Sequence, residues 1–344
     1  MQTQVLRVDS KVNIKIAADL IRRGETVAFP TETVYGLGAD ATNKAAVAKI
    51  FAAKGRPTFD PLIVHIASIE MLTTVSNGIP KVAWQLIDTF WPGPLTLILP
   101  KADEIPDIVT SGLSTVAVRM PRNEVALALI KELGVPIAAP SANSFGRPSP
   151  TCADHVMEDL GGKIALILDG GPTQVGVEST VLDLTCSPPS ILRPGGVSRE
   201  CLEDILGKGS VSLGNESKMF RSPGQMKQHY APRAKVLLFG GKRRKRVIVA
   251  MREKIKELKA AGKIGVMVPD EELPHFSDEN VVALGLGPFT SMEAVASNLF
   301  ATMRALDRSK VDYILTLVPP KEGIGLAVFD RLFKAAGSQL IEVD

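Results

Sequence analysis

Cysteine is scarce in this chain, and so are long apolar runs. The 344 residues include only Cys152, Cys186 and Cys201, with no C-x-x-C spacing, so neither a disulfide framework nor a structural zinc site is indicated. No apolar run reaches the roughly 18 residues of a membrane span, and residues 1–13 lack the apolar segment of a secretion signal. These absences predict a cytoplasmic protein without membrane contact.

Charge of one sign is not in excess either. The formal net charge is +3, and residues 1–233 carry equal numbers of basic and acidic side chains. A protein that grips a nucleic-acid backbone normally carries a basic surplus on one domain. We therefore expect no strong direct tRNA binding, and we interpret the basic run Lys242 to Arg246 as a solvated turn between a strand and a helix.

Several standard catalytic signatures are missing. The chain has no G-x-x-x-x-G-K-[ST] phosphate loop and no G-x-S-x-G nucleophile elbow. Residues 36–41 match G-x-G-x-x-A but do not directly follow the apolar run 27–29, so we interpret them as a glycine turn. The four histidines are not spaced as metal ligands, so a catalytic metal held by protein side chains is not indicated; they are His65, His155, His229 and His275. Any metal should arrive with its substrate, a pattern that Mg²⁺ carried by triphosphate oxygens would suit.

Length and hydrophobic periodicity predict two α/β domains, since 344 residues exceed the size at which one core usually stops growing. Residues 1–206 alternate helical patterns with short apolar strands, some of them consecutive, which predicts a twisted mixed sheet with helices. Residues 207–233 lose apolar periodicity and are interpreted as a linker. Residues 234–344 alternate more regularly, as is typical of a smaller, Rossmann-like doubly wound domain.

The segment Ala139 to Pro150 has the composition of a binding loop. Three prolines stiffen it, while serine, asparagine and arginine side chains supply hydrogen-bond donors that suit an anionic ligand. Further cations stand beside glycine or proline turns or at strand ends, where α/β sheets bind ligands. Together they predict a substrate with more than one anionic group; these cations are Lys54, Arg56, Arg119, Arg147 and Arg193.

Five motifs in residues 10–205 carry a specific resemblance. Lys54-Gly55-Arg56-Pro57, Trp91-Pro92-Gly93-Pro94-Leu95-Thr96, Ala139-Pro140-Ser141-Ala142-Asn143, Val177-Glu178-Ser179-Thr180-Val181 and Arg193-Pro194-Gly195 resemble those of the YrdC-type threonylcarbamoyl-AMP synthase family. His229-Tyr230-Ala231-Pro232 in the linker, followed by a Rossmann-like domain, is similar to the long two-domain form of that family. The Trp91 to Pro94 segment itself is interpreted as a rigid packing turn.

The resemblance implies a nucleotidyltransferase. L-threonine and bicarbonate or CO2 form a carbamate, which displaces pyrophosphate from ATP to give L-threonylcarbamoyladenylate. This is the first step of threonylcarbamoyladenosine formation in tRNA, and a downstream tRNA threonylcarbamoyltransferase complex receives the product. Such chemistry relies on positioning and on charge stabilisation at phosphorus, which agrees with a chain that offers cations and hydroxyls but no catalytic triad.

Motif positions also imply roles for individual residues. Lys54, Arg56, Ser141 and Asn143 match the catalytic K-x-R and S-x-N elements. The implied ATP contacts are Arg56, Asp60, Thr115, Ser141, Asn143, Ser149, Arg193 and Tyr230. The implied L-threonine contacts are Thr33, His65, Arg119, Ala139 through its backbone, and Ser179. Arg147 falls outside the matched positions.

Two of these positions raise particular questions. Asp60 stands where the family usually has asparagine, and a carboxylate there would repel phosphate. Tyr230 is similar to a lid residue over the nucleotide, although a tyrosine that pins a linker to a domain surface has the same sequence signal. Other residues have structural alternatives as well: strand hydroxyls for Thr33, Thr115 and Ser179, and a core histidine for His65.

Two competing functions are compatible with parts of the sequence. One is an RNA-binding module of the same fold, suggested by the basic run at residues 242–246. The other is a carbamoyl-adenylate enzyme of hydrogenase maturation, which shares the YrdC-type fold but carries cysteine-rich zinc segments. This chain has no such segment.

Overall fold

The computed structural model describes residues 2–8, 11–214, 222–224, 226, 229–277 and 280–344. Contacts divide the chain into two compact units. The first comprises residues 1–145 and 149–225, and the second comprises residues 146–148 and 226–344. The short segment 146–148 of the predicted binding loop therefore belongs to the second unit.

The first unit alternates helices and strands as the sequence predicts. Its helices are α1 (Lys11–Arg22), α2 (Lys44–Lys54), α3 (Ile69–Val75), α4 (Lys81–Phe90), α5 (Asp107–Thr110), α6 (Glu124–Leu133), α7 (Ala153–Leu160) and α8 (Arg199–Leu206). Its strands are β1 (Gln4–Arg7), β2 (Val27–Phe29), β3 (Gly36–Asp40), β4 (Ile63–His65), β5 (Leu95–Pro100), β6 (Thr115–Arg119), β7 (Ile137–Ala138), β8 (Leu166–Asp169), β9 (Thr180–Asp183), β10 (Ser190–Arg193) and β11 (Ser212–Leu213).

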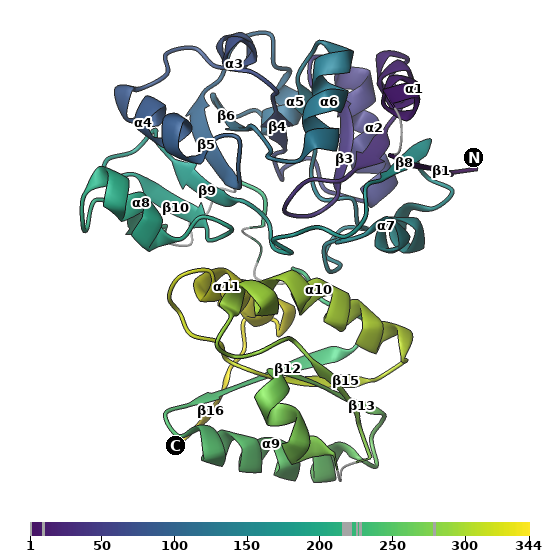
Figure 1. The fold of residues 1–344 in the computed structure, drawn as a ribbon, viewed down its shortest axis with the longest axis vertical. Helices are drawn as coiled ribbons and strands as arrows, with labels where there is room; N and C mark the ends of the chain where they lie inside the picture. The colour runs from purple at the N-terminus through teal and green to yellow at the C-terminus, as the bar shows by residue number, and fades with distance from the viewer. Residues whose placement is uncertain (1, 9–10, 215–221, 225, 227–228, 278–279) are drawn as a thin grey trace. The chain divides into compact units, whose positions relative to one another are not determined.

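These strands form one mixed sheet with the order β1-β8-β2-β3-β7-β4-β6-β5-β9-β10-β11 (Figure 1). The sheet contains parallel pairs such as β4 with β6 and antiparallel pairs such as β5 with β6. The predicted mixed sheet is thereby confirmed. Its last strand, β11, pairs with β10, so the first unit continues beyond residue 206, where the sequence pattern placed the end of the domain.

Helices bury apolar stripes against both faces of this sheet. On one side α1 and α6 pack on β2 and β8 through residues such as Ala18, Leu129 and Leu168. On the other, a larger core joins α2, α4 and α7 to the sheet through residues such as Ile50 and Leu86. Burial on both faces keeps the strands rigid, which favours precise placement of the groups at their ends.

The glycine turn expected at residues 36–41 is wrong, because Gly36–Asp40 is strand β3. It pairs antiparallel with β2, which brings Gly38 opposite Val27. A Cβ atom on Gly38 would lie 2.7 Å from the ring of Phe29 and 2.8 Å from Ile137 Cγ2. Glycine is needed there for close packing within the sheet.

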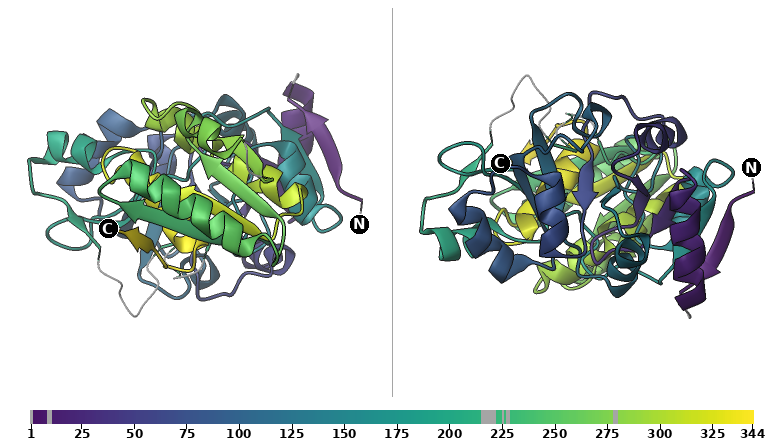
Figure 2. Two further views of the ribbon diagram at one scale, coloured as in Figure 1. Left: turned by 90° about the horizontal axis from the view of Figure 1, so that it is seen from below. Right: turned by 90° about the horizontal axis from the view of Figure 1, so that it is seen from above.

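The second unit is a smaller doubly wound α/β domain, as predicted. It contains β12 (Lys235–Gly241), α9 (Arg244–Leu258), β13 (Ile264–Val268), the 3-10 helix η1 (Asp270–Phe276), β14 (Val282–Gly285), α10 (Met292–Arg308), β15 (Tyr313–Leu317), α11 (Gly325–Ala335) and β16 (Ile341–Val343). All strand pairs are parallel, in the order β14-β13-β15-β12-β16. In Figure 1 α10 and α11 lie on one side of this sheet and α9 on the other, and Figure 2 (left) looks onto α9.

Candidate active site

Strand alternation gathers polar side chains on one face of the first sheet. Along β4, β5, β6 and β9, every second residue points into the large core. The intervening residues form a small apolar cluster of Ile63, Ile98, Ala117 and Val181. Because side chains alternate between faces with a period of two, polar residues two positions away share this second face; they are His65, Thr96, Thr115, Arg119 and Ser179.

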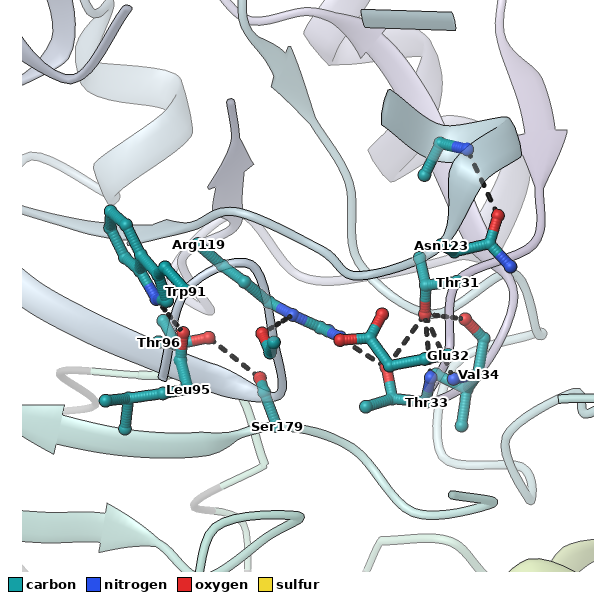
Figure 3. A network of polar contacts seen from close by, with 12 residues as sticks. Thr31, Glu32, Thr33, Val34, Trp91, Leu95, Thr96, Arg119, Asn123 and Ser179 are labelled. Atoms are coloured by element: carbon teal, nitrogen blue, oxygen red, sulfur yellow. Dashed lines mark hydrogen bonds and ion pairs between the residues drawn. The ribbon is translucent and has the colours of Figure 1, made fainter. Parts of the chain in front are cut away.

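Arg119, at the end of β6, is a buried cation on this face. Its Nε donates to the carbonyl oxygen of Gly93 over 3.2 Å, and its Nη1 donates to Thr33 Oγ1 over 2.9 Å. Its Nη2 lies 2.6 Å from Glu32 Oε1 in an ion pair. Figure 3 shows Glu32 and Thr33 beside the end of the guanidinium. Since arginine has five N–H donors in a fixed fork, donors remain for a substrate carboxylate.

The turn that carries Glu32 and Thr33 is held by the side chain of Thr31. Its Oγ1 donates to the carbonyl of Val34 over 2.6 Å and accepts from the backbone N–H groups of Thr33 and Val34. The carbonyl of Glu32 in turn accepts from the N–H of Val175 over 2.8 Å. Both ends of the turn are thereby fixed, so Glu32 and Thr33 reach Arg119 from a rigid backbone.

His65 lies opposite Arg119 in the parallel pairing of β4 with β6. Burial, together with the charge of Arg119, lowers the pKa of His65 to about 3, so the ring is neutral at physiological pH. Its Nδ1 is 3.2 Å from the carbonyl oxygen of Ile63. Because a carbonyl can only accept, Nδ1 carries the proton, and Nε2 presents a lone pair that suits a substrate hydroxyl.

Ser179 joins the two halves of the predicted site. Its hydroxyl is 2.7 Å from Thr96 Oγ1, and Arg193 donates both to its carbonyl, over 2.9 Å, and to its Oγ, over 3.1 Å. Ala139, whose backbone is a predicted threonine contact, donates its own N–H to Ile63 on β4. The predicted threonine residues therefore lie together at the ends of neighbouring strands.

Lys54, the last residue of α2, holds the predicted binding loop. Its Nζ lies 2.5 Å from the carbonyl oxygens of Ser141 and Asn143, to which it donates. Burial, and then the neighbouring charge of Arg56, lowers the pKa of this amine well below its usual value. A phosphate group beside Lys54 would oppose this shift and favour the charged form.

Arg56 and Asp60 form a buried ion pair two residues beyond α2. Arg56 Nη2 is 3.0 Å from Asp60 Oδ2, and the guanidinium also donates to the carbonyls of Asp60 and Pro61. Burial raises the pKa of Asp60, while Arg56, Lys54 and Arg193 act to lower it. Three basic side chains therefore act on one buried carboxylate, a grouping that suits a polyanionic ligand.

The remaining loop residues are tied to the same region. Ser149 Oγ hydrogen-bonds Glu178 Oε1, and Asn143 Nδ2 donates to the carbonyl of Ser144 over 2.8 Å. The charge of Glu178 also acts to raise the pKa of Lys54. The loop thus brings Ser141, Asn143 and Ser149 to the lysine and arginine cluster.

Three further predicted or suspected residues have contacts of their own within each unit. Thr115 shares the polar face but stands at the opposite end of β6 from Arg119. Arg147 forms an ion pair of 2.6 Å with Asp307 of α10, inside the second unit. Tyr230 also belongs to that unit, where its ring lies 5.6 Å from that of Phe300.

No role is assigned from the sequence to Glu32, Thr96 or Glu178. Thr96 and Glu178 stand in motifs that carry the family resemblance, and Glu32 directly precedes the predicted contact Thr33. Each contacts a predicted site residue: Arg119, Ser179 and Ser149 respectively. The available signal was a carboxylate or hydroxyl within an otherwise uncharged motif. Such a residue has little reason to be buried unless it binds a neighbour or a ligand.

Known protein families match both parts of the chain. A family model described as telomere recombination matches residues 19–195, and one described as threonylcarbamoyl-AMP synthase, C-terminal domain, matches residues 197–337. A threonylcarbamoyl-AMP synthase of Pyrococcus abyssi is 48% identical over 338 residues, which are 96% of each chain. This chain belongs to the threonylcarbamoyl-AMP synthase family. The family resemblance of its motifs is thereby confirmed.

Other members of the threonylcarbamoyl-AMP synthase family agree over the full length. The protein of Bacillus subtilis is 47% identical over 329 residues, covering 94% of this chain and 93% of the relative. A crystal structure of P. abyssi Sua5 complexed with L-threonine matches with a TM-score of 0.93 and 46% identity, covering 100% of both chains. The two-domain fold and the nucleotidyltransferase class of the family are therefore as predicted.

Proposed function

We propose that this chain condenses L-threonine, bicarbonate or CO2, and ATP into L-threonylcarbamoyladenylate and pyrophosphate. The observation that carries the proposal is the hydrogen bonding of Arg193, a predicted ATP contact, to Ser179, a predicted threonine contact. On one side stand Arg119, Thr33 and the neutral His65, which suit a hydroxy amino acid. On the other stand Arg56, Lys54 and Arg193, which suit a triphosphate.

The chemistry follows from the charges of the reactants. Arg119 holds the carboxylate of threonine, and the lone pair on His65 Nε2 accepts from its hydroxyl. Once the amine carries the new carboxylate, an oxygen of that carbamate attacks the α-phosphorus and pyrophosphate leaves. The cations of the second set stabilise the charge that gathers on the phosphates. No protein nucleophile is required, because the carbamate oxygen supplies the electron pair.

Magnesium enters this proposal as part of the nucleotide substrate. Among residues with described positions, no group of three or more histidine, cysteine, aspartate or glutamate side chains is arranged to hold a metal ion. Mg²⁺ prefers phosphate oxygens and retains several waters. We therefore propose that ATP brings Mg²⁺ into the site.

The wider setting also remains a proposal. We expect the adenylate to pass to a tRNA threonylcarbamoyltransferase complex and the reaction to take place in the cytoplasm. Within the described ranges, none of the helices has the length and apolar character needed to cross a membrane.

Tyr230 stays a predicted nucleotide contact: substitution by alanine should increase hydrolytic loss of the labile adenylate, measured as ATP consumed per product formed. Equal ratios in both proteins would contradict a lid role.

Pyrophosphate release is the direct test of the function. The purified chain is incubated with ATP and Mg²⁺, with and without L-threonine and bicarbonate, and pyrophosphate and the adenylate are both quantified. Release that requires both co-substrates supports the proposal. Release without threonine would refute it, and release driven by carbamoyl phosphate instead would favour the carbamoyl-adenylate alternative.

A further inference from the structure

Glu32 is a buried carboxylate whose hydrogen bonding is incomplete. Glu32 is 2% exposed, and neither oxygen of its carboxylate accepts a hydrogen bond from the residues that the structure describes. Its 2.6 Å contact with Arg119 Nη2 is an ion pair in which the N–H does not point along the contact. Buried carboxylates normally accept several hydrogen bonds, so this one has capacity for a donor that is not part of the chain.

The position of Glu32 limits what that donor can be. Thr31 and Val175 hold its backbone, so the side chain reaches Arg119 from a fixed turn. Figure 3 shows the Glu32 carboxylate beside the end of the guanidinium, next to Thr33. A ligand whose carboxylate binds Arg119 therefore brings its neighbouring atoms close to Glu32.

An α-amino acid zwitterion has the matching charge pattern. Its ammonium is two bonds from the carboxylate carbon and carries three N–H donors, which need acceptors when the group leaves water. The residues that the sequence assigns to threonine include one cation, Arg119, and no anion. Glu32 supplies the missing negative charge at the right place.

We propose that Glu32 is a substrate-binding residue that receives the ammonium group of L-threonine while Arg119 receives its carboxylate. This inference rests on the proposed function. It also predicts selectivity for amino acids over hydroxy acids, since an ammonium group brings a positive charge and three donors to the buried carboxylate, whereas a hydroxyl brings one neutral donor. After carbamate formation the nitrogen has lost its positive charge, and Glu32 repels the new carboxylate away from itself.

The test compares two ligands that differ at one group. Isothermal titration calorimetry on the full chain measures the Kd of L-threonine and of 2,3-dihydroxybutanoate of the same configuration, in which a hydroxyl replaces the ammonium. In Glu32→Gln the threonine Kd should rise about 100-fold, while the Kd of the hydroxy acid should change less than about threefold. Binding of a non-hydrolysable ATP analogue reports that the variant is folded.

Each outcome bears on the inference. If both ligands weaken equally, Glu32 acts only by orienting Arg119, and the inference is overturned; an unchanged threonine Kd overturns it as well. If Glu32→Gln does not fold, Glu32→Asp is measured in its place, and the Kd of threonine alone should rise about tenfold. An equal rise in the Kd of both ligands would overturn the inference. If the wild-type protein binds no threonine, the proposed function fails first.

Discussion

Replacing Asp60 with asparagine tests whether the negative charge of Asp60 lowers both the stability of the fold and the affinity of the predicted nucleotide site for ATP. Asp60 is 1% exposed and lies 3.0 Å from Arg56, with Lys54 and Arg193 also attracting its charge. Burial nevertheless raises the pKa of this carboxyl, because lost hydration outweighs the attraction of the cations. At neutral pH the ionised carboxylate therefore lowers the stability of the fold relative to a neutral group at the same position.

The expected magnitudes follow from the contacts that remain. In Asp60→Asn, Arg56 still donates to the carbonyl oxygens of residues 60 and 61. The free energy of unfolding should therefore stay within about 1 kcal/mol of the wild-type value. Breaking a buried ion pair without such remaining acceptors typically lowers it by roughly 3–5 kcal/mol. A phosphate charge about 8 Å away would be repelled by Asp60 by about 2 kcal/mol at an effective dielectric constant of about 20. The Kd for ATP should therefore fall by about 30-fold.

Urea denaturation and calorimetry with a non-hydrolysable ATP analogue measure the two quantities. Asp183→Asn is a matched control, because Asp183 is also fully buried but accepts hydrogen bonds from Thr185; it should leave ATP affinity unchanged. A raised pKa also means that wild-type stability falls as the pH rises through the folded-state pKa of Asp60, and the substitution removes that contribution. An unchanged ATP Kd in folded Asp60→Asn would refute the reasoning.

Three further predictions concern the scaffold and the threonine side of the site. Thr96→Val removes the hydrogen bond to Ser179 and should raise the threonine Kd by roughly fivefold, about 1 kcal/mol, without affecting ATP binding; an unchanged threonine Kd would separate Ser179 from the site. Gly38→Ala places a methyl group 2.7 Å from Phe29 and should lower the free energy of unfolding by about 1–3 kcal/mol in urea, whereas no loss would mean that the strands can shift. Because the pKa of His65 is depressed to about 3, stability should fall by up to about 1.4 kcal/mol per pH unit as the pH drops below about 6.5. His65→Gln should remove that slope, and parallel pH curves for the two proteins would show that His65 is not buried in its neutral form.

Local patterns in the sequence were sufficient to predict the fold class and the family. Helical periodicity and apolar runs report burial directly, so the two α/β domains and the mixed first sheet were predictable. Strand β3 was not predictable, because two glycines in a short segment are typical of a turn. Only the folded structure shows that Phe29 and Ile137 occupy the space beside Gly38. A glycine that is required by packing cannot be told from one that is required by a turn without knowing what it faces.

The site divides in the same way. The motifs identified Lys54 and Arg119 as functional cations, and those assignments to ATP and threonine stay predictions. Their partners were not predictable. Lys54 donates to the carbonyl oxygens of Ser141 and Asn143, far along the chain. Arg119, at the end of β6, forms an ion pair with Glu32 in the connection between β2 and β3. Sequence alone determines which charges and hydroxyls the chain carries and how the strands alternate. Tertiary structure decides which of those charges are brought together out of water, because pairing and burial depend on contacts between segments far apart in the chain, which local sequence patterns do not show.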